Sequence, residues 1–119
     1  PHILALRDLE RIRAEKLWQN NQEKRYYTEI FDTIRIYLER RYGIQTMEKT
    51  SAEILDMISE FKIEPKEYKE LEALFTLSDL VKFAKYKATQ QENEEAVPTA
   101  VRFVNATFLQ GMEDEKGRD

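Results

Sequence analysis

One stretch of the sequence, residues 17–53, constrains the fold more than any other part. Apolar and aromatic residues recur there at helical spacing and predict a helix over about 22–42. This stripe consists of Tyr27, Ile30, Phe31, Ile34, Tyr37 and Leu38. Gly43 follows and supplies the left-handed residue that commonly ends a helix. Thr50 with Glu53 then forms a capping box, which predicts the start of a new helix. This order of signals favours an all-helical fold.

The segments before and after this stretch also show helical spacing and no strand pattern. Pro1 suits the first turn of a helix that we expect to end near residues 18–20, before Asn20 and Asn21. The helix that begins at Thr50 should be short. Pro65 predicts the next helix start, and residues 76–79 resemble a second cap, so we expect a bend or a new start there.

The last third of the chain is expected to contain a loop, one helix and a tail. Residues 89–95 are polar and predict the loop. The final helix begins near Pro98, or begins at Glu94 and is bent, because proline disrupts a helix interior. The predicted fold is therefore all-α, a compact bundle of five to six helices of unequal length. We expect one domain over residues 1–110, followed by a disordered, charged tail over residues 111–119.

The composition argues against most kinds of chemistry. The 119 residues contain no cysteine, one histidine and three scattered glycines, and the formal net charge is −4. Thiolate and two-histidine metal sites, a serine paired with a histidine base, and a glycine-rich phosphate loop therefore have no candidates. Pairs of carboxylates at helical spacing are typical of solvated helix faces. We expect no enzyme activity, and no catalytic, cofactor-binding or metal-binding residues.

The sequence contains no apolar run of the ~18 residues that would indicate a membrane-spanning helix, and no signal peptide. The chain begins at Pro1, directly inside an expected helix start. We therefore expect it to be a fragment of a longer protein from which an upstream part has been removed.

Basic residues near aromatic residues provide the remaining functional lead. One basic group lies in the helix over 22–42, and another surrounds Phe83. Such groups bind nucleic acid or anionic membranes, but they also occur as helix-end charges paired with glutamates. The chain has six tyrosines, six phenylalanines and one tryptophan, and a domain of this size is not expected to bury all of Tyr26, Tyr27, Tyr37, Tyr42, Phe83 and Tyr86. Half-exposed aromatic residues are common at protein contacts, although these residues could also simply form the wall of a thin core. The candidate partner-binding residues are Trp18, Tyr26, Arg40, Arg41, Lys82, Phe83 and Lys85.

Short motifs along nearly the whole chain resemble one known family. They comprise Pro1-His2-Ile3 with Ala5-Leu6-Arg7-Asp8-Leu9, Glu15-Lys16-Leu17-Trp18-Gln19, Tyr27, the run from Ile36 to Ile44, Met47-Glu48, Thr50 with Glu53-Ile54, the run from Leu80 to Lys85, Glu92-Asn93-Glu94 and Phe103-Val104. This pattern resembles the cytoplasmic C-terminal region of BatD-like, oxygen-tolerance-type bacterial membrane proteins, particularly the Bacteroidetes versions. The motifs are helix ends, caps and core positions.

The resemblance implies a location and a type of partner. Such regions follow a single membrane-spanning helix and lie on the cytoplasmic side of the bacterial inner membrane. The family acts with MoxR-type ATPases and von Willebrand factor A domain proteins in envelope stress tolerance. The resemblance therefore implies a non-catalytic docking domain that binds one of these proteins.

Two other functions remain open at this stage. A soluble helical regulator would bind nucleic acid through Arg35, Arg40 and Arg41, although the region around them has only a weakly positive net charge. A homodimerisation domain is equally compatible with the sequence.

Overall fold

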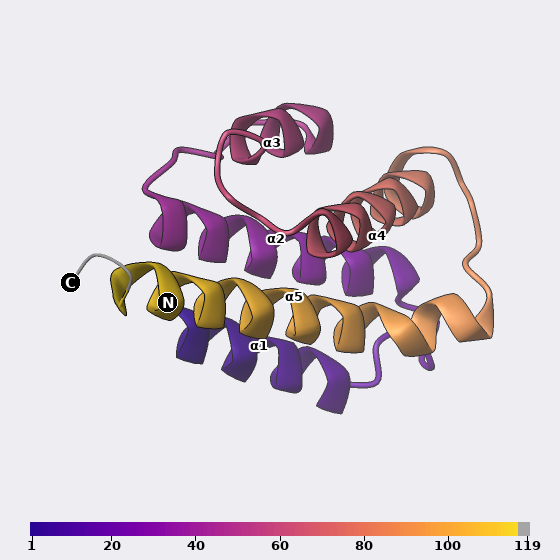
Figure 1. Ribbon diagram of the computed structural model, residues 1–119. Helices are drawn as coiled ribbons and strands as arrows, with labels where there is room; N and C mark the ends of the chain where they lie inside the picture. Colours follow the sequence, from indigo (N-terminus) through magenta and orange to yellow (C-terminus); the bar gives the residue numbers. More distant parts are fainter. Residues whose placement is uncertain (117–119) are drawn as a thin grey trace.

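The computed structural model describes residues 1–116 of the chain, and its helices lie in an order that the sequence signals largely predict (Figure 1). They are α1 (His2–Ala14), α2 (Glu23–Tyr42), α3 (Ser51–Ile58), α4 (Pro65–Phe83) and α5 (Gln90–Lys116). No strand occurs within these residues. The all-α prediction of five to six helices is therefore confirmed.

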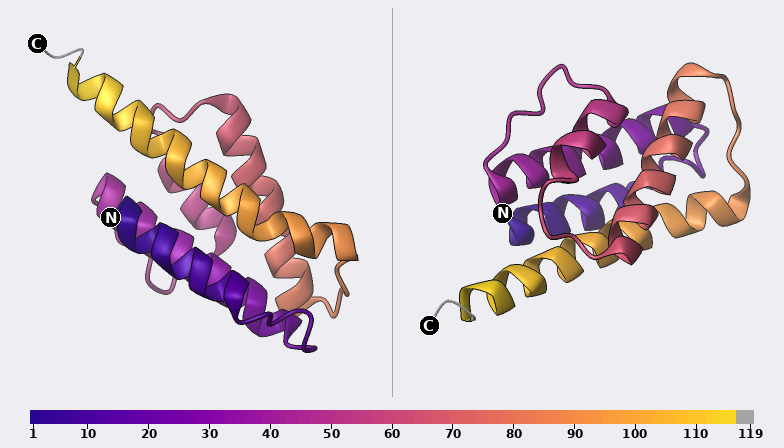
Figure 2. Two further views of the ribbon diagram at one scale, coloured as in Figure 1. Left: turned by 90° about the horizontal axis from the view of Figure 1, so that it is seen from below. Right: turned by 45° about the horizontal axis from the view of Figure 1, so that its top comes forward.

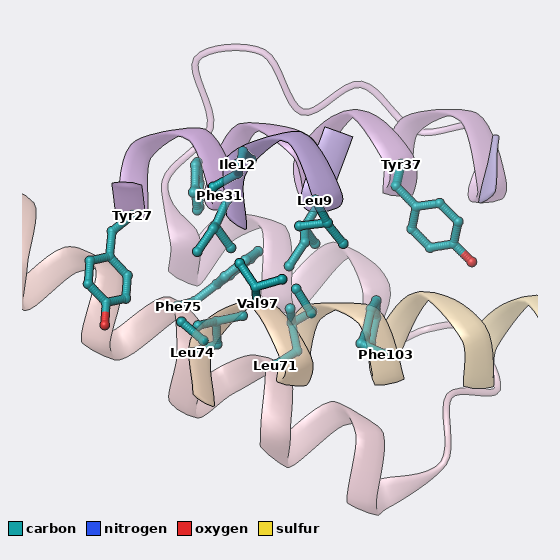
Figure 3. Close-up of a cluster of buried hydrophobic side chains, with 14 of the residues drawn as sticks. Leu9, Ile12, Tyr27, Phe31, Tyr37, Leu71, Leu74, Phe75, Val97 and Phe103 are labelled. Carbon is teal, nitrogen blue, oxygen red and sulfur yellow. The ribbon is translucent and has the colours of Figure 1, made fainter. Parts of the chain in front are cut away.

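Helices α2 and α5 form the centre of the bundle. Helix α1 packs against both of them, α4 also packs against both, and α3 lies mainly on α4 (Figure 1). The centre of the core lies between α1, α2, α4 and α5, where Tyr27, Phe75 and Phe103 are almost fully buried (Figure 3). Ile54 and Ile58 of α3 belong to the same core. Each of these residues lies on the apolar stripe of its helix, which explains why the hydrophobic spacing predicts the elements so well.

The strongest local signals act as predicted. Gly43 has φ +67° and closes α2 with a hydrogen bond from its N–H to the Glu39 carbonyl. The Thr50 hydroxyl accepts from the Glu53 N–H at 3.1 Å, and the Glu53 carboxylate accepts from the Thr50 N–H at 2.9 Å. Both halves of the capping box are therefore present at the start of α3.

Two helix boundaries in the first four helices differ from the predictions. Helix α1 ends at Ala14, not near residues 18–20, and turns follow it with Lys16 and Asn21 at positive φ. Helix α4 runs without interruption through residues 76–79. The residues that resemble a cap there bind other elements instead. The Ser78 hydroxyl donates to the Tyr27 carbonyl at 3.4 Å, and the Asp79 carboxylate accepts from the Ser51 hydroxyl at 3.0 Å.

The prediction of a loop over residues 89–95 is wrong, because α5 already begins at Gln90. Thr89 and Glu92 form a second capping box. The Glu92 N–H donates to the Thr89 hydroxyl at 3.0 Å, and the Thr89 N–H donates to the Glu92 carboxylate at 2.8 Å. The helix continues through Pro98, and its first turns are set at an angle to the rest (Figure 2).

The C-terminal end of α5 also differs from the expected boundary between a domain and a tail. The helix extends to Lys116, through residues 111–116 of the segment expected to be disordered, whereas residues 117–119 lie outside the described part. Two contacts hold this end. The Arg41 guanidinium donates to the Thr107 carbonyl at 3.4 Å, and the Gln110 amide donates to the Lys62 carbonyl. Gly111 lies so close to the Arg41 guanidinium that a Cβ there would require the guanidinium to shift.

Candidate protein-binding surface

The seven predicted contact residues do not form one surface. Helix α2 has 20 residues, which corresponds to a length of about 30 Å. Arg40 and Arg41 lie at its C-terminal end, whereas the C-terminal end of α4, with Phe83, lies beside the opposite end of the bundle (Figure 1). Trp18 belongs to the turns between α1 and α2, where it packs against the core and shares a hollow with Lys87. A single partner footprint over all seven residues is therefore not supported.

Tyr26 is not a surface residue, and its assignment to a contact surface is wrong. It is 3% exposed, and its hydroxyl donates to the Asn93 backbone carbonyl at 2.8 Å. The neighbouring Tyr27 hydroxyl donates to the Asn93 side-chain carbonyl at 2.7 Å, and the Asn93 amide donates to Glu23 at 3.1 Å. Tyr26 therefore belongs to a polar cluster that joins α2 to α5.

Burial is the main cause of the raised pKa values of the two tyrosines in this cluster. It raises the pKa of Tyr26 to about 12 and raises the pKa of Tyr27 still further, because a phenolate here would lack water. Both hydroxyls therefore remain neutral donors at physiological pH. No described buried side-chain polar atom lacks a hydrogen-bond partner, so the polar groups of this cluster satisfy one another.

The two arginines at the end of α2 differ in what they contact. Arg40 is exposed. Arg41 is half-buried, holds the Thr107 carbonyl, and places its guanidinium 4.6 Å from the centre of the Tyr42 ring. Beside it the His2 ring stacks on the Phe108 ring at 3.6 Å. Arg41 therefore joins α2 to α5, and a role in binding would compete with this role in packing.

The C-terminal end of α4 presents the clearest exposed feature among the predicted residues. Phe83 is 77% exposed, the largest exposed fraction among the large hydrophobic side chains described. The Lys82 ammonium lies 4.1 Å from the centre of the Phe31 ring and 5.1 Å from that of Phe83. Burial lowers the pKa of Lys82, and the nearby Asp79 and Asp32 oppose this shift. The lysine thus spans from the core to the exposed phenylalanine.

The turn after α4 holds the third residue of this group. Lys85 has φ +58°, a conformation that residues other than glycine adopt at some cost in energy. The turn is closed by hydrogen bonds from the Ala84 and Tyr86 N–H groups to the Leu80 carbonyl, at 3.0 and 3.1 Å. Lys85 is therefore fixed close to Phe83 and exposed to solvent.

Two members of this surface, Leu80 and Tyr86, are absent from the list of candidate partner-binding residues. Leu80 is 41% exposed, one helical turn before Phe83. Tyr86 is 38% exposed, and its hydroxyl donates to the Glu92 carboxylate at 2.7 Å. The available signal was the spacing of Leu80 and Phe83, which places them on one side of α4. We define the Phe83 patch as Leu80, Lys82, Phe83, Lys85 and Tyr86.

Within residues 1–116, no group of three or more histidine, aspartate or glutamate side chains is arranged to hold a metal ion. No helix in this part of the chain combines the length and the apolar character needed to cross a bilayer. Comparison with known proteins finds no matching family model, no similar curated protein and no similar solved structure.

Proposed function

We propose that the chain is a non-catalytic docking domain that binds another protein through the Phe83 patch. The observation that carries this proposal is the exposed fraction of Phe83, 77%, at the end of a helix whose other face is fixed in the core. Burying an exposed phenylalanine at a contact is favourable by roughly 1.5–3 kcal/mol. Aromatic residues are enriched at protein interfaces, which makes such a residue a suitable anchor.

The residues around Phe83 also favour a protein-binding role for this exposed side chain. Leu80 and Tyr86 extend the apolar area, and Lys82 and Lys85 add cations at its edge. The turn that carries these residues is tied back to α4 by two backbone hydrogen bonds. Little conformational entropy would therefore be lost when a partner binds, which favours affinity.

The identity of the partner and the location rest on the resemblance alone. We propose that the domain belongs to a membrane-anchored envelope-stress protein and lies on the cytoplasmic side of the bacterial inner membrane. The partner would then be a MoxR-type ATPase or a von Willebrand factor A domain protein. Fractionation of the native full-length protein tests this location. It should sediment with membranes, resist an alkaline wash and require detergent for release.

Nucleic-acid binding receives less support from the geometry. The Arg35 side chain is 18% exposed and lies 3.6 Å from both the Asp32 and the Glu39 carboxylates. Arg41 is held by Thr107. Only Arg40 of the three proposed phosphate contacts is exposed, and one cation makes a weak electrostatic footprint.

Titration calorimetry of the purified chain with each candidate partner protein tests the docking proposal. Phe83→Ala should weaken binding by about tenfold or more, because it removes the central anchor. It should leave the melting temperature nearly unchanged, since Phe83 is exposed. Met47→Ala is the matched control, because Met47 is 72% exposed but lies in the loop between α2 and α3. Equal affinities of the Phe83 variant and the control would overturn the proposed contact.

A further inference from the structure

A groove runs between α4 and α5, next to the Phe83 patch. It consists of two adjoining hollows of about 290 and 520 Å³ that share Ala73, Leu77 and Glu92 as lining residues. The two helices diverge towards the segment that joins them (Figure 2), and Tyr86 of this segment lines the second hollow. We call this feature the α4–α5 groove.

The floor of the α4–α5 groove is apolar. Leu74 is 5% exposed and Ala96 is 2% exposed, so the floor belongs to the core of the bundle. Leu77 is half-buried between them, and Leu80 and Tyr86 of the Phe83 patch line the end near the turn. An occupant would therefore bring apolar side chains to meet this floor.

The rim of the groove is acidic. Four glutamates line the two hollows against one lysine, Lys69. They are Glu70, Glu72, Glu92 and Glu95. Glu70 lies 3.8 Å from Arg102, but Glu72 and Glu95 are exposed and have no salt-bridge partner among the described residues. The rim therefore carries negative charge that the surrounding chain does not fully neutralise.

The charge at Glu92 is held in place by its hydrogen bonds. Its carboxylate accepts from the Thr89 N–H at 2.8 Å and from the Tyr86 hydroxyl at 2.7 Å. The hydrogen bond from the Thr89 backbone, above all, lowers the pKa of Glu92. The carboxylate at the centre of the rim therefore stays ionised and oriented near neutral pH.

From this arrangement we infer that the α4–α5 groove binds a basic amphipathic helix of a partner protein. A third helix fits between two diverging helices by packing its side chains into their grooves. Its apolar stripe would cover the floor, and lysines or arginines beside the stripe would face the glutamates. An extended strand fits poorly, because the backbone groups of α4 and α5 are already bonded within the helices. A phosphate backbone would be repelled by the rim.

This inference rests on the proposed docking function and specifies the part of the partner that is recognised. The probe is a synthetic 18-residue helical peptide with a leucine stripe and lysines on both sides of it. A peptide of the same design with glutamates in place of the lysines serves as the negative probe. Binding to the purified chain is measured by fluorescence anisotropy, and the site is located by amide NMR shifts.

The basic peptide should bind and shift the amides of Ala73, Leu77 and Ala96, whereas the acidic peptide should not. The double variant Glu72→Gln/Glu95→Gln should weaken binding by roughly five- to tenfold, because two rim charges are lost. The control is Glu60→Gln/Glu64→Gln. It removes the same charge from two exposed positions in the loop between α3 and α4.

Equal weakening by the rim and control variants, or amide shifts confined to residues outside the groove, would overturn the inference. Sedimentation of the chain alone tests the other occupant, since a dimer abolished by the rim variant would assign the groove to a second copy. The same variants are then tested on the candidate partner proteins. A partner that depends on Phe83 but not on the rim leaves the docking function standing without this groove. Failure of every partner to bind removes the docking function itself.

Discussion

At the scale of single residues, the polar cluster around Asn93 shows what local sequence patterns miss. The helical stripe of α2 includes Tyr27 but places Tyr26 beside it, where a tyrosine suits the surface as well as the core. The hydrogen-bond partner that holds Tyr26 in the core is Asn93, which lies 67 residues further along the chain. A contact over that separation leaves no trace in helical spacing, which explains why Tyr26 was assigned to a binding surface.

The burial of Tyr26 predicts a loss of stability in alkali. An unfolded tyrosine titrates near pH 10, whereas burial raises the pKa of Tyr26 to about 12. Between these values the unfolded chain has lost the proton that the folded chain retains. The stabilisation is therefore complete below about pH 10 and is lost as pH rises towards 12.

Tyr26→Phe should make this decline less steep, by up to about 1.4 kcal/mol per pH unit. Urea unfolding at intervals from pH 7 to pH 11 measures it. The variant also loses the hydrogen bond to Asn93, so its stability at pH 7 should be lower by about 1 kcal/mol. The range from pH 7 to pH 9 serves as the internal control, because both proteins should give parallel curves there. A decline as steep as that of the wild type would show that Tyr26 ionises equally in both states.

At the scale of the elements, the sequence predicts a helix end correctly where that end requires a particular backbone conformation or a partner for backbone N–H groups. Gly43 meets the need for a left-handed residue, and Thr50 with Glu53 satisfies N–H groups that would otherwise be unpaired. The same capping pattern occurs at Thr89 and Glu92, where it begins α5 well before Pro98. Residues 76–79 resemble a cap in sequence but do not begin a helix. Their polar side chains instead form hydrogen bonds with other helices, Ser78 with Tyr27 and Asp79 with Ser51.

Pro98 in the interior of α5 predicts a stabilising substitution. Proline has no N–H to donate to the Glu94 carbonyl, and its ring crowds that carbonyl. Pro98 is exposed, so Pro98→Ala removes no core packing. The free energy of unfolding should rise by about 1–3 kcal/mol.

Thermal and urea unfolding measure the effect of Pro98→Ala. The control is Asn105→Ala at an exposed position of the same helix, which should give only about 0.5 kcal/mol from helix propensity. An unchanged or lower stability of the Pro98 variant would mean that the angle at the start of α5 is needed for its packing.

At the scale of the whole molecule, the packing of the helices predicts unequal stability. Ile54 and Ile58 of α3 are buried in the same core as the other helices, but α3 has only eight residues and its contacts are mainly with α4. Sub-global opening begins where few buried contacts hold an element. Amides of α3 should therefore exchange with solvent by local opening, while those of Ile30, Ile34 and Phe103 should exchange only through global unfolding.

Native-state hydrogen exchange in low urea separates these two classes. Tyr68→Phe sharpens the test, because the Tyr68 hydroxyl donates to the Leu55 carbonyl at 3.0 Å and ties α3 to α4. This variant should speed exchange in α3 and change global stability by about 1 kcal/mol or less. If α3 amides exchange with the same free energy as those of α2, the molecule opens only as one unit.

The fold class could be predicted from the sequence because helical stripes and caps are local, and each element carries its own signal. The arrangement of candidate contact residues could not, because it depends on how helices distant in sequence pack together. Arg40 and Phe83 both lie at helix ends in basic, aromatic surroundings, yet the packing puts them at opposite ends of the bundle (Figure 1). The α4–α5 groove likewise combines residues from two helices, and neither helix indicates it alone.

The side-by-side, oppositely directed course of α1 and α5 also determines how the molecule would respond to mechanical load. Pro1 and His2 lie in one hollow with Phe108, Gly111 and Met112, so the first turn of α1 lies beside the C-terminal part of α5. A pull on the two ends would separate the His2–Phe108 stack first and then peel α1 from α5 one turn at a time. The contacts would break one after another instead of sharing the force. The domain would therefore unfold at low force, in the unzipping geometry.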